Sequence, residues 1–512
     1  FSSIVPGQPI IFVIQRIFNR PSWQLSILSG LLVGLSYPPL KLGLVSWIAL
    51  VPWLMALDRS NPKQSAALGY LAGFVANGSA LYWLSLNSGG PFPVVFASLV
   101  GSVIYLALGW AVVGFLFSYL HTHTGKGFLL LPFLWASMEF GMSFGPLGFP
   151  WASLATPQTD YVPLIQLAEL TGIYGISFWA VWLNVLVTRN LVQPALLRPR
   201  LMAVAVAVLV IPWLYGYLRL ATLRYSSGNS PSLVVAAVQP NVGPHDKWNP
   251  AKRDWVFDLL DSLFLVAARE DPDLIIWPES ATPAYLRTAA ARLKPVMNRV
   301  TSTGIPLLTG TIDWEIRDGI RRVYNSVLFI TPDGTMDTYH KIHLVPLAEY
   351  NPLSDQLPVS QTLSLGDFTP GSSVSVFRVN GIPFSSVICY ESAFPQLIRR
   401  FVKKGARFLV IVVNDGWFGN SSEPYQHAAL ARLRAVEHRM PVVRSANTGI
   451  SAIYEPTGFP AVRLPVGAEG VIVAGISPGR GKSFYSRFGD LFALTCVGVF
   501  LGLGAWFWYR EK

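Results

Sequence analysis

Three residues that could together perform acyl transfer each follow or border a short apolar run. Glu279 closes "DLIIWPE", Lys341 lies in "YHKIHLVPLAEY", and Cys389 closes "SSVICYE". A thiol, with an ordinary pKa of about 8.5, needs a base or a nearby cation to become a nucleophilic thiolate. A carboxylate can accept the proton, and an ammonium can stabilise the thiolate and then the oxyanion of a tetrahedral intermediate. The set is therefore sufficient for acyl transfer through a thioester.

Each residue also has an ordinary structural explanation, because a buried cysteine is usually a small hydrophobic residue and single charges usually face solvent. Histidines leave a second arrangement open. His340 and His343 flank the lysine, while His427 and His438 lie on an expected helix, so a Cys–His dyad would need the fold to place it. His427 and His438 do not have the i, i+4 spacing of a helical zinc motif. We therefore expect neither a metal nor a cofactor.

The residues from 232 onward carry the elements that must position these side chains. Apolar runs typical of strands alternate with amphipathic stretches typical of helices. The runs include "SLVVAAVQPN", "PDLIIWPES", "PFSSVICYES" and "RFLVIVVNDGWF", and "WVFDLLDSLFLVAARE" is the clearest helix. "TPDGTM" and "EPTGFP" predict hairpin turns. This order favours a layered α/β domain with a mixed sheet.

The composition of the chain points to a membrane. Of its 512 residues, 52% are hydrophobic and 13% are charged, against about 25% charged in a typical soluble domain. Only four of the 28 acidic residues precede Arg219. The first 219 residues are therefore expected to lie in a membrane. The net charge of +11 is not taken as a sign of nucleic-acid binding, because many cations flank apolar segments.

Eight apolar segments are long enough to be considered as membrane spans, which need roughly 20 residues. They lie near 22–39, 42–57, 66–86, 94–119, 127–145, 162–187, 201–218 and 489–508. The first is expected to be a retained helix rather than a signal peptide, because it lacks a small-residue cleavage site. Eight spans place both termini on the same side of the membrane. The termini and the loops on that side hold ten lysines and arginines, whereas the short loops on the opposite side hold Lys41 alone. This asymmetry predicts cytoplasmic termini and places residues 220–488 on the opposite side.

Several residues of the predicted spans and their loops leave two interpretations open. Glu139 and Glu169 are either functional or a structural pair, since intramembrane charges are costly. In "GPLGFPWASLATPQTDY", Phe149 and Trp151 fit an aromatic belt or a gate for a lipid acyl chain. Cys496 lies in an apolar run and is expected to be a small residue buried in lipid.

The motifs around the three candidate residues resemble those of the nitrilase superfamily. "WPES" contains Glu279, "HKIHLVPLAEY" contains Lys341 and Glu349, and "ICYES" contains Cys389. Members of this superfamily use a Glu–Lys–Cys triad on an αββα sandwich. The resemblance therefore implies this fold for residues 220–488.

The whole chain resembles the bacterial apolipoprotein N-acyltransferases of the inner membrane. "KWNP", "VVNDGWFGNS" and "RSANTGISAIYEPTG" are similar to that family. The order of parts is also similar: seven membrane helices in 1–219, an external nitrilase-like domain in 220–488, and a closing helix with a short cytoplasmic tail in 489–512. The resemblance implies a phospholipid as acyl donor, a diacylglyceryl-modified apolipoprotein as acceptor, a periplasmic catalytic domain and contact with inner-membrane lipids.

The resemblance also implies roles for individual residues. Glu279 would be the general base, Cys389 the acyl carrier, and Lys341, with a backbone N–H near Tyr390, the oxyanion site. Supporting residues would be Glu349, Tyr390 and Glu391. Contacts with lipid or acyl chain would come from Trp248, Trp417, Phe418, Phe149 and Trp151. For Trp248, Trp417 and Phe418, aromatic packing in a loop is the alternative. The Pro- and Ser-rich loop 351–370 is expected to be a lid that admits lipid, with a plain linker as the alternative.

Two other functions stay open from the sequence. A membrane-tethered amidase of the nitrilase type would share the triad without needing eight spans. A transporter with an external binding domain would need no nucleophile. The spans show neither an obvious inverted repeat nor a dense set of charges, which disfavours the transporter.

Overall fold

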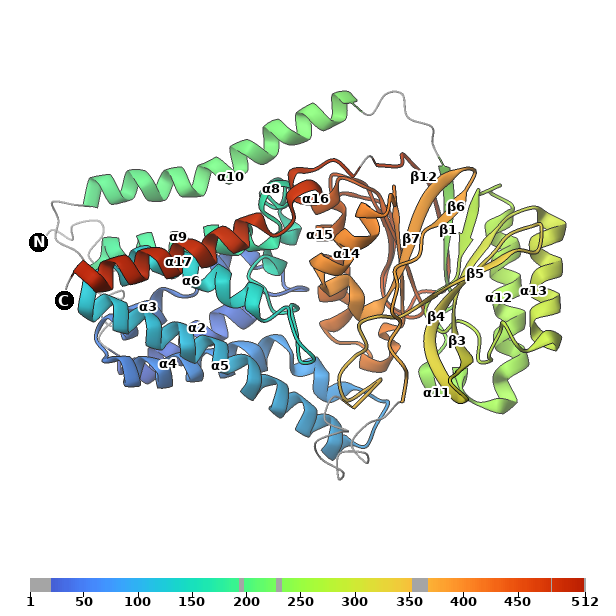
Figure 1. Cartoon of the computed structure of the whole chain (residues 1–512), viewed down its shortest axis with the longest axis horizontal. Coiled ribbons are helices and arrows are strands. Elements are labelled where there is room, and N and C mark those ends of the chain that lie inside the picture. Colours follow the sequence, from blue (N-terminus) through green and yellow to red (C-terminus); the bar gives the residue numbers. More distant parts are fainter. Residues whose placement is uncertain (1–19, 193–197, 227–232, 352–366, 480, 511–512) are drawn as a thin grey trace, which may run out of the picture.

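The computed structural model describes residues 20–192, 198–226, 233–351, 367–479 and 481–510. It has a helical region and a two-sheet region that lie side by side (Figure 1). The predicted loop 351–370 lies largely outside the described residues, apart from its ends. Each of the eight predicted apolar segments forms helix, although not always one continuous helix. The main helices are α2 (Ser22–Ser36), α3 (Val51–Asp58), α4 (Pro62–Ala80), α5 (Phe92–Thr124), α6 (Gly127–Gly141), α9 (Ile173–Val192), α10 (Arg198–Ser226) and α17 (Leu491–Arg510).

Four helices among the described residues are long and apolar enough to cross a membrane. They are α5, α9, the Pro199–Leu223 part of α10, and α17, whereas α2, α6 and the stretches Gly43–Asp58 and Val162–Thr171 are shorter apolar helices. Local sequence signals determine where some of these helices begin or end. Asn61 and Gln64 form a reciprocal capping box at the start of α4, and α5 ends at Gly125 with a φ of 64°. α10 continues to Ser226, beyond the predicted boundary at 219.

The predicted segment 162–187 is not a single helix. It breaks into α7 (Val162–Ile165), α8 (Ala168–Thr171) and the start of α9. The break before α9 lies at Gly172, whose φ is 64° and where a Cβ atom would lie 2.7 Å from the Tyr485 ring. The chain therefore turns at a residue without a side chain so that an aromatic ring from the far end of the sequence can pack there.

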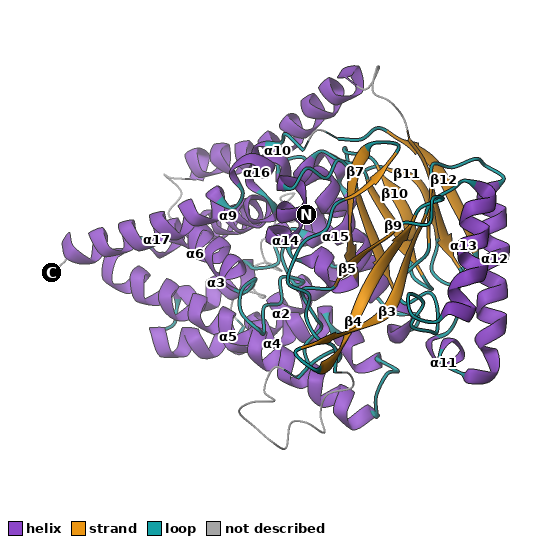
Figure 2. Ribbon diagram, turned by 45° about the vertical axis from the view of Figure 1, so that its right-hand side comes forward, coloured by secondary structure: helices purple, strands orange, loops and turns teal. Residues whose placement is uncertain are grey.

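The region from β1 to β12 is a sandwich of two mixed six-stranded sheets. Figure 2 shows its strands packed between helices. The first sheet has the order β12-β1-β2-β3-β4-β5 and the second the order β11-β10-β9-β8-β7-β6. The first sheet comprises β12 (Gly470–Ile476), β1 (Leu233–Gln239), β2 (Leu274–Ile276), β3 (Leu307–Arg317), β4 (Ile320–Ile330) and β5 (Met336–His340). The second comprises β11 (Pro460–Leu464), β10 (Ser451–Tyr454), β9 (Val442–Ala446), β8 (Leu409–Val413), β7 (Ile382–Ile388) and β6 (Phe377–Val379).

Helices cover both outer faces, which confirms the predicted αββα arrangement. α12 (Arg253–Ala268) and α13 (Ala290–Thr303) lie on the first sheet, and α14 (Pro395–Lys403) and α15 (Glu423–His438) lie between the second sheet and the helical region (Figure 1). In β1, Val235 and Ala237 belong to the large core that includes both sheets, whereas Ala236 and Val238 pack in the core that contains residues of α12. This alternation follows from side chains pointing to opposite faces of a strand.

Both predicted hairpin turns are confirmed. β4 and β5 are joined through Gly334, whose N–H donates to the Thr331 carbonyl, and β10 and β11 through Gly458, whose N–H donates to the Glu455 carbonyl. Parallel pairs β1–β2–β3 and β7–β8–β9 run through the middle of each sheet. The carboxyl ends of β2 and β7 thereby carry the segments that hold Glu279 and Cys389.

Candidate active site

Glu279 follows β2 and lies against β3 at a glycine. Gly310 N–H donates to the Pro278 carbonyl, and a Cβ atom at Gly310 would lie only 2.5 Å from the Glu279 Cα. A side chain at this position of β3 would therefore displace the glutamate. The Glu279 carboxylate is buried and accepts a 2.8 Å hydrogen bond from Asn325 Nδ2.

Lys341 follows β5 and is buried among carboxylates. Its backbone N–H donates to the Asn325 carbonyl, and its Nζ lies 2.8 Å from Glu349 and 3.6 Å from Glu279. Burial alone would lower the pKa of Lys341, but the charges of Glu349, Glu279 and Cys389 outweigh it and raise the pKa well above its usual value. The ammonium therefore keeps its charge at neutral pH and can stabilise an anion.

Cys389 is the first residue of the 3₁₀ turn η7 (Cys389–Ala393), directly after β7. Its φ is +52°, a left-handed conformation that residues with a side chain rarely adopt and that is common at functional sites. The residue is partly exposed. Burial of the thiol and the negative charge of Glu279 raise its pKa, while Lys341 lowers it. The thiol is thus protonated at rest, so a base must take its proton before it can attack.

Glu391 links the turn of Cys389 to the segment that carries Lys341. Its Oε1 accepts hydrogen bonds from the Tyr339 hydroxyl at 2.6 Å, from Ile342 N at 2.7 Å and from His343 N at 3.1 Å. Its Oε2 accepts from Ile388 N at 2.8 Å. A fully buried carboxylate with four donors fixes the position of both segments.

Glu349 and Asn325 complete the polar group around the lysine. Glu349 accepts from Val345 N and from Lys341 Nζ, both at 2.8 Å. The Asn325 amide donates 2.8 Å hydrogen bonds to both Glu349 and Glu279. Sequence reasoning missed Asn325. The available signal was an amide in the otherwise mostly apolar strand "VYNSVLFI".

Tyr390 connects the turn of Cys389 to the helical region. Its hydroxyl donates a 2.8 Å hydrogen bond to the Gly148 carbonyl, and its ring centroid lies 5.9 Å from that of Phe149 and 6.4 Å from that of Trp151. Trp151 is buried, and its Nε1 donates to Gln426 Oε1 at 2.9 Å. The structure therefore packs Trp151 inside the junction between the two regions.

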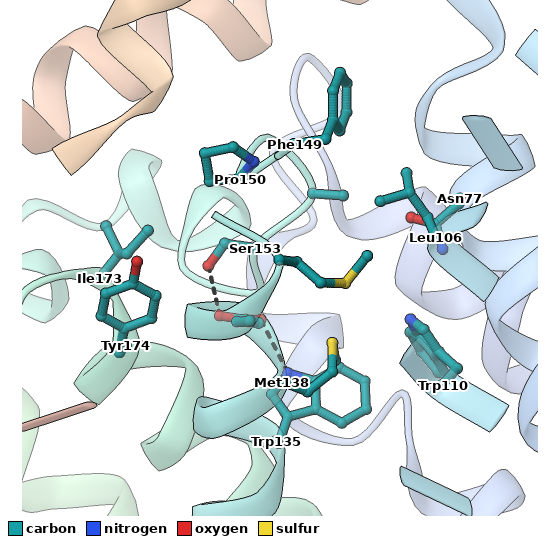
Figure 3. A pocket seen from close by; sticks show the side chains of 13 residues that line it. Asn77, Leu106, Trp110, Trp135, Met138, Phe149, Pro150, Ser153, Ile173 and Tyr174 are labelled. Carbon is teal, nitrogen blue, oxygen red and sulfur yellow. Dashed lines mark hydrogen bonds between the residues drawn. The ribbon is translucent and has the colours of Figure 1, made fainter. Parts of the chain in front are cut away.

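Glu139 holds the loop that carries these aromatic residues. Its Oε1 accepts from Trp135 Nε1 and Leu154 N, and its Oε2 accepts from Ser153 Oγ. Ser153 and Trp135, both labelled in Figure 3, line a cavity of about 30 Å³ together with Glu139, Phe149 and Pro150. Glu139 thus anchors the end of α6 to the loop beneath Tyr390.

Glu169 has different hydrogen-bond partners from Glu139, and it joins α10 to the sandwich. It accepts hydrogen bonds from the Tyr215 hydroxyl at 2.5 Å, from Arg219 Nε at 2.5 Å and from Arg439 Nε at 2.7 Å. Both glutamates therefore have hydrogen-bonded structural surroundings, but in different places. Cys496, expected in lipid, instead packs with Ala136 of α6 and Phe178 of α9.

The remaining predicted aromatic contacts are Trp248, Trp417 and Phe418. Trp248 is 40% exposed, whereas its neighbour Lys247 is buried with Nζ 3.5 Å from the Glu279 carbonyl oxygen. Burial lowers the pKa of Lys247 to about 8 against the opposing charge of Glu279. Sequence reasoning missed Lys247, because nothing near it in the sequence marks it as buried.

Trp417 and Phe418 contact the segment between α4 and α5. The Trp417 carbonyl accepts from Ser88 N at 2.8 Å, and the Phe418 ring centroid lies 4.9 Å from that of Trp83 in η2 (Tyr82–Leu86). Gln426 on α15 extends this contact: its Oε1 accepts from Trp83 Nε1 and Trp151 Nε1, and its Nε2 donates to the Ala80 carbonyl. One side chain of α15 thereby binds three segments of the helical region.

A second buried polar group lies behind Cys389. His427 Nδ1 lies 2.9 Å from Asp415 and 3.3 Å from Glu423, and Arg444 Nη2 lies 2.7 Å from Asp415. Asp415, Glu423 and His427 are residues of the kinds that bind metals, and their ligand atoms lie within 4.8 Å of one another. Here the imidazole and the guanidinium already occupy both Asp415 oxygens and one Glu423 oxygen, so the arrangement fits a hydrogen-bonded ion network.

Comparisons with known proteins match both regions of the chain. A sequence profile described as carbon-nitrogen hydrolase matches residues 234–485, and one described as apolipoprotein N-acyltransferase N-terminal domain matches residues 29–186. The apolipoprotein N-acyltransferase of Geobacter metallireducens is 35% identical over 498 residues, covering 93% of this chain and 94% of that protein. The apolipoprotein N-acyltransferase of Chlorobaculum tepidum is 31% identical over 524 residues, covering 95% of this chain and 96% of that protein.

Proposed function

Because this chain belongs to the apolipoprotein N-acyltransferase family, we propose that it moves an acyl chain from a phospholipid to the N-terminal α-amine of a diacylglyceryl-cysteine on an apolipoprotein. This reaction completes lipoprotein maturation. The observation that carries the proposal is similarity to such enzymes over 93% of the chain. The site supports it, since the Lys341 ammonium lies 3.6 Å from the Glu279 carboxylate and the charges of both act on the Cys389 thiol, beside a helical region with membrane-length helices.

In the first half of the reaction, Glu279 takes the proton of the Cys389 thiol. The thiolate attacks the carbonyl carbon of a phospholipid ester, and the Lys341 ammonium and the Tyr390 N–H hold the oxyanion that forms. The intermediate collapses by breaking the bond to the glycerol oxygen. That oxygen receives the proton from Glu279 and leaves as lysophospholipid, while the acyl chain stays on Cys389 as a thioester.

In the second half, the α-amine of the diacylglyceryl-cysteine replaces the lysophospholipid. The amine attacks the thioester and loses a proton to Glu279, the carbon–sulfur bond breaks, and the Cys389 thiolate recovers the proton. The product is an amide, which is far more stable than the thioester. The two substrates thus react in turn, in a ping-pong order, and the site needs no other nucleophile.

Other residues take supporting roles in this proposal. Glu349 keeps Lys341 charged and in place, Glu391 fixes the turn of Cys389, and Tyr390 supplies the oxyanion donor and the link to the helical region. Contacts with acyl chains are assigned to Trp248, Trp417, Phe418, Phe149 and Trp151.

The membrane arrangement is also part of the proposal. Residues 1–219 would supply seven spans and 489–512 the eighth, with both termini in the cytoplasm and residues 220–488 in the periplasm of a bacterial inner membrane. The cation asymmetry of the loops and the four membrane-length helices support this arrangement. Both substrates are lipid-anchored, so a site at the outer leaflet meets each of them without extracting it from the bilayer.

Mass spectrometry of the purified full-length protein after exposure to phospholipid tests this function. We expect Cys389 to gain the mass of one acyl chain, lysophospholipid to appear in equal amount, and Glu279→Ala to abolish both. Addition of a diacylglyceryl-cysteine peptide should then remove the acyl chain from Cys389. An unmodified Cys389 together with ammonia release from small amides would instead identify a membrane-tethered amidase.

A further inference from the structure

His427 on α15 contacts the backbone of the nucleophile itself. Its Nε2 lies 3.0 Å from the Cys389 carbonyl oxygen and 3.0 Å from Ser392 Oγ, and the ring is fully buried. On its other side, Nδ1 lies 2.9 Å from Asp415 and 3.3 Å from Glu423. The acid–base steps proposed above use none of this group, although it lies directly behind Cys389.

The surroundings of His427 favour the doubly protonated ring. Burial alone would lower its pKa and Arg444 opposes its charge, but Asp415 outweighs both and raises the pKa to about 9. Asp415 keeps its negative charge because Arg444 and His427 outweigh its burial and lower its pKa to about 2. Both ring nitrogens therefore carry hydrogen at neutral pH, and Nε2–H donates to the Cys389 carbonyl.

Because of the geometry of the peptide group, the contact between His427 and the Cys389 carbonyl also sets the direction of the Tyr390 N–H. The Cys389 carbonyl and the Tyr390 N–H belong to one planar trans peptide group, so they point to opposite sides of it. Fixing the carbonyl toward α15 therefore fixes the N–H away from α15. As the second residue of η7, Tyr390 has no acceptor for its N–H within that turn, because 3₁₀ bonds run from residue i+3 back to residue i.

We propose that His427 is a positioning residue that orients and polarises the Cys389–Tyr390 peptide group, so that the Tyr390 N–H donates to the oxyanion of each tetrahedral intermediate. The inference rests on the proposed acyl transfer. A cation that hydrogen-bonds a carbonyl draws electron density toward it and makes the N–H of the same peptide group a stronger donor. Asp415 and Glu423, on the other side of the ring, keep the imidazolium in this orientation.

Two reactions of Cys389 distinguish an effect of His427 on the oxyanion donor from an effect on packing alone. Acylation by a p-nitrophenyl ester or a phospholipid forms an oxyanion, whereas alkylation by iodoacetamide forms none. Removal of an oxyanion donor typically slows acylation about 100-fold or more. In the detergent-solubilised full-length protein, we expect His427→Leu to lower the acylation rate constant about 100-fold with little change in KM, and to leave the alkylation rate constant within about threefold. His427→Gln, which retains a neutral donor, should recover part of the loss.

His438 on the same helix provides the matched control. It is also fully buried, and its Nδ1 bonds Ser486 Oγ rather than the nucleophile. His438→Leu should lower the melting temperature without changing the ratio of the acylation to the alkylation rate. Should His427→Leu fail to fold, the ratio in His427→Gln decides, because a neutral donor predicts a reduced ratio and packing alone predicts an unchanged one.

The pH dependence gives a third readout. In the wild type, the ratio of acylation to alkylation should fall as the pH rises through about 9, where His427 loses its charge, and in His427→Gln it should stay flat. The titratable groups bonded to the ring are Asp415 and Glu423, with Arg444 beyond them. Burial and the charge of Asp415 raise the pKa of Glu423 to about 7, so its titration precedes that of His427. An unchanged ratio in folded His427→Leu or His427→Gln would overturn the inference while leaving the acyl transfer itself intact. Failure of the wild type to form any thioester would overturn the proposed function instead.

Discussion

The Tyr390 hydroxyl donates a 2.8 Å hydrogen bond to the Gly148 carbonyl, which joins the residue beside Cys389 to a loop of the helical region. The bond is buried, and Phe149 packs near the same ring. One of the links between the turn of Cys389 and the helical region is therefore a side chain that is the immediate neighbour of Cys389.

Replacing Tyr390 with phenylalanine removes this bond and leaves a buried carbonyl without its partner. We expect the free energy of unfolding to fall by about 1–2 kcal/mol and the rate of acylation by phospholipid to fall severalfold. Thermal unfolding in detergent and single-turnover acylation measure the two effects. Tyr350→Phe is the matched control, because its hydroxyl bonds the Pro146 carbonyl of the same loop at a more exposed position and should matter less.

Replacing Asn325 with alanine removes the donor that Glu279 and Glu349 share. Two buried carboxylates would each lose a 2.8 Å hydrogen bond, which shifts both relative to Lys341. We expect acylation of Cys389 to slow about 10- to 100-fold, since hydrogen bonds to charged groups contribute about 1.5–3 kcal/mol. The exposed Asn380, whose amide bonds Asp273, offers a control that should keep the full rate.

Replacing Lys247 with methionine should stabilise the protein at neutral pH. The pKa of Lys247 is lowered to about 8 from 10.5, so below pH 8 the folded chain carries the cost of burying the charge, up to about 3 kcal/mol. Between pH 8 and 10.5 the folded chain releases the proton while the unfolded chain keeps it. Wild-type stability therefore rises relative to the variant over this range.

Thermal unfolding between pH 7 and pH 10 checks this expectation. The advantage of Lys247→Met should be largest at pH 7 and should shrink above pH 8. Lys252→Met, at an exposed lysine paired with Asp246, should show no such trend. A constant difference at all pH values would mean that the charge of Lys247 has no part in the effect.

Replacing Glu169 with glutamine should weaken the attachment of α10 to the sandwich. The change removes two ion pairs and leaves the buried Arg439 guanidinium without its carboxylate, which typically costs about 3–5 kcal/mol. Hydrogen exchange in the last turns of α10 should speed up. Asp160→Asn is the control, because its pair with Arg432 is longer and more exposed and should contribute less than about 1 kcal/mol.

The division into a helical region and a sandwich was predictable because it depends on local patterns. Long apolar runs and short alternating runs identify their elements without reference to the rest of the chain. Glu279 and Cys389 stand directly after such runs, so both could be identified as candidate catalytic residues from the local sequence. The break at Gly172 could not be predicted in this way, because its reason is the ring of Tyr485, which lies hundreds of residues later.

The residues that sequence reasoning missed are defined by contacts between distant segments. Lys247 resembles a surface lysine in its sequence context, and only the fold buries it against Glu279. His427 was noted as a partner for the thiol in an alternative Cys–His dyad, whereas the structure places it on the carbonyl of Cys389. Trp151, predicted as an aromatic-belt residue or part of a lipid gate, is buried at the junction, where its indole N–H donates to Gln426.

The hydrogen bonds of Gln426 to Trp83, Trp151 and Ala80 have a consequence for how the protein unfolds. α15 packs its other residues into the sandwich, so the same helix is core to both regions. Separating the regions would expose two indoles and leave a buried amide without partners. The chain should therefore melt in one cooperative transition, and a sandwich expressed without its helices should be insoluble.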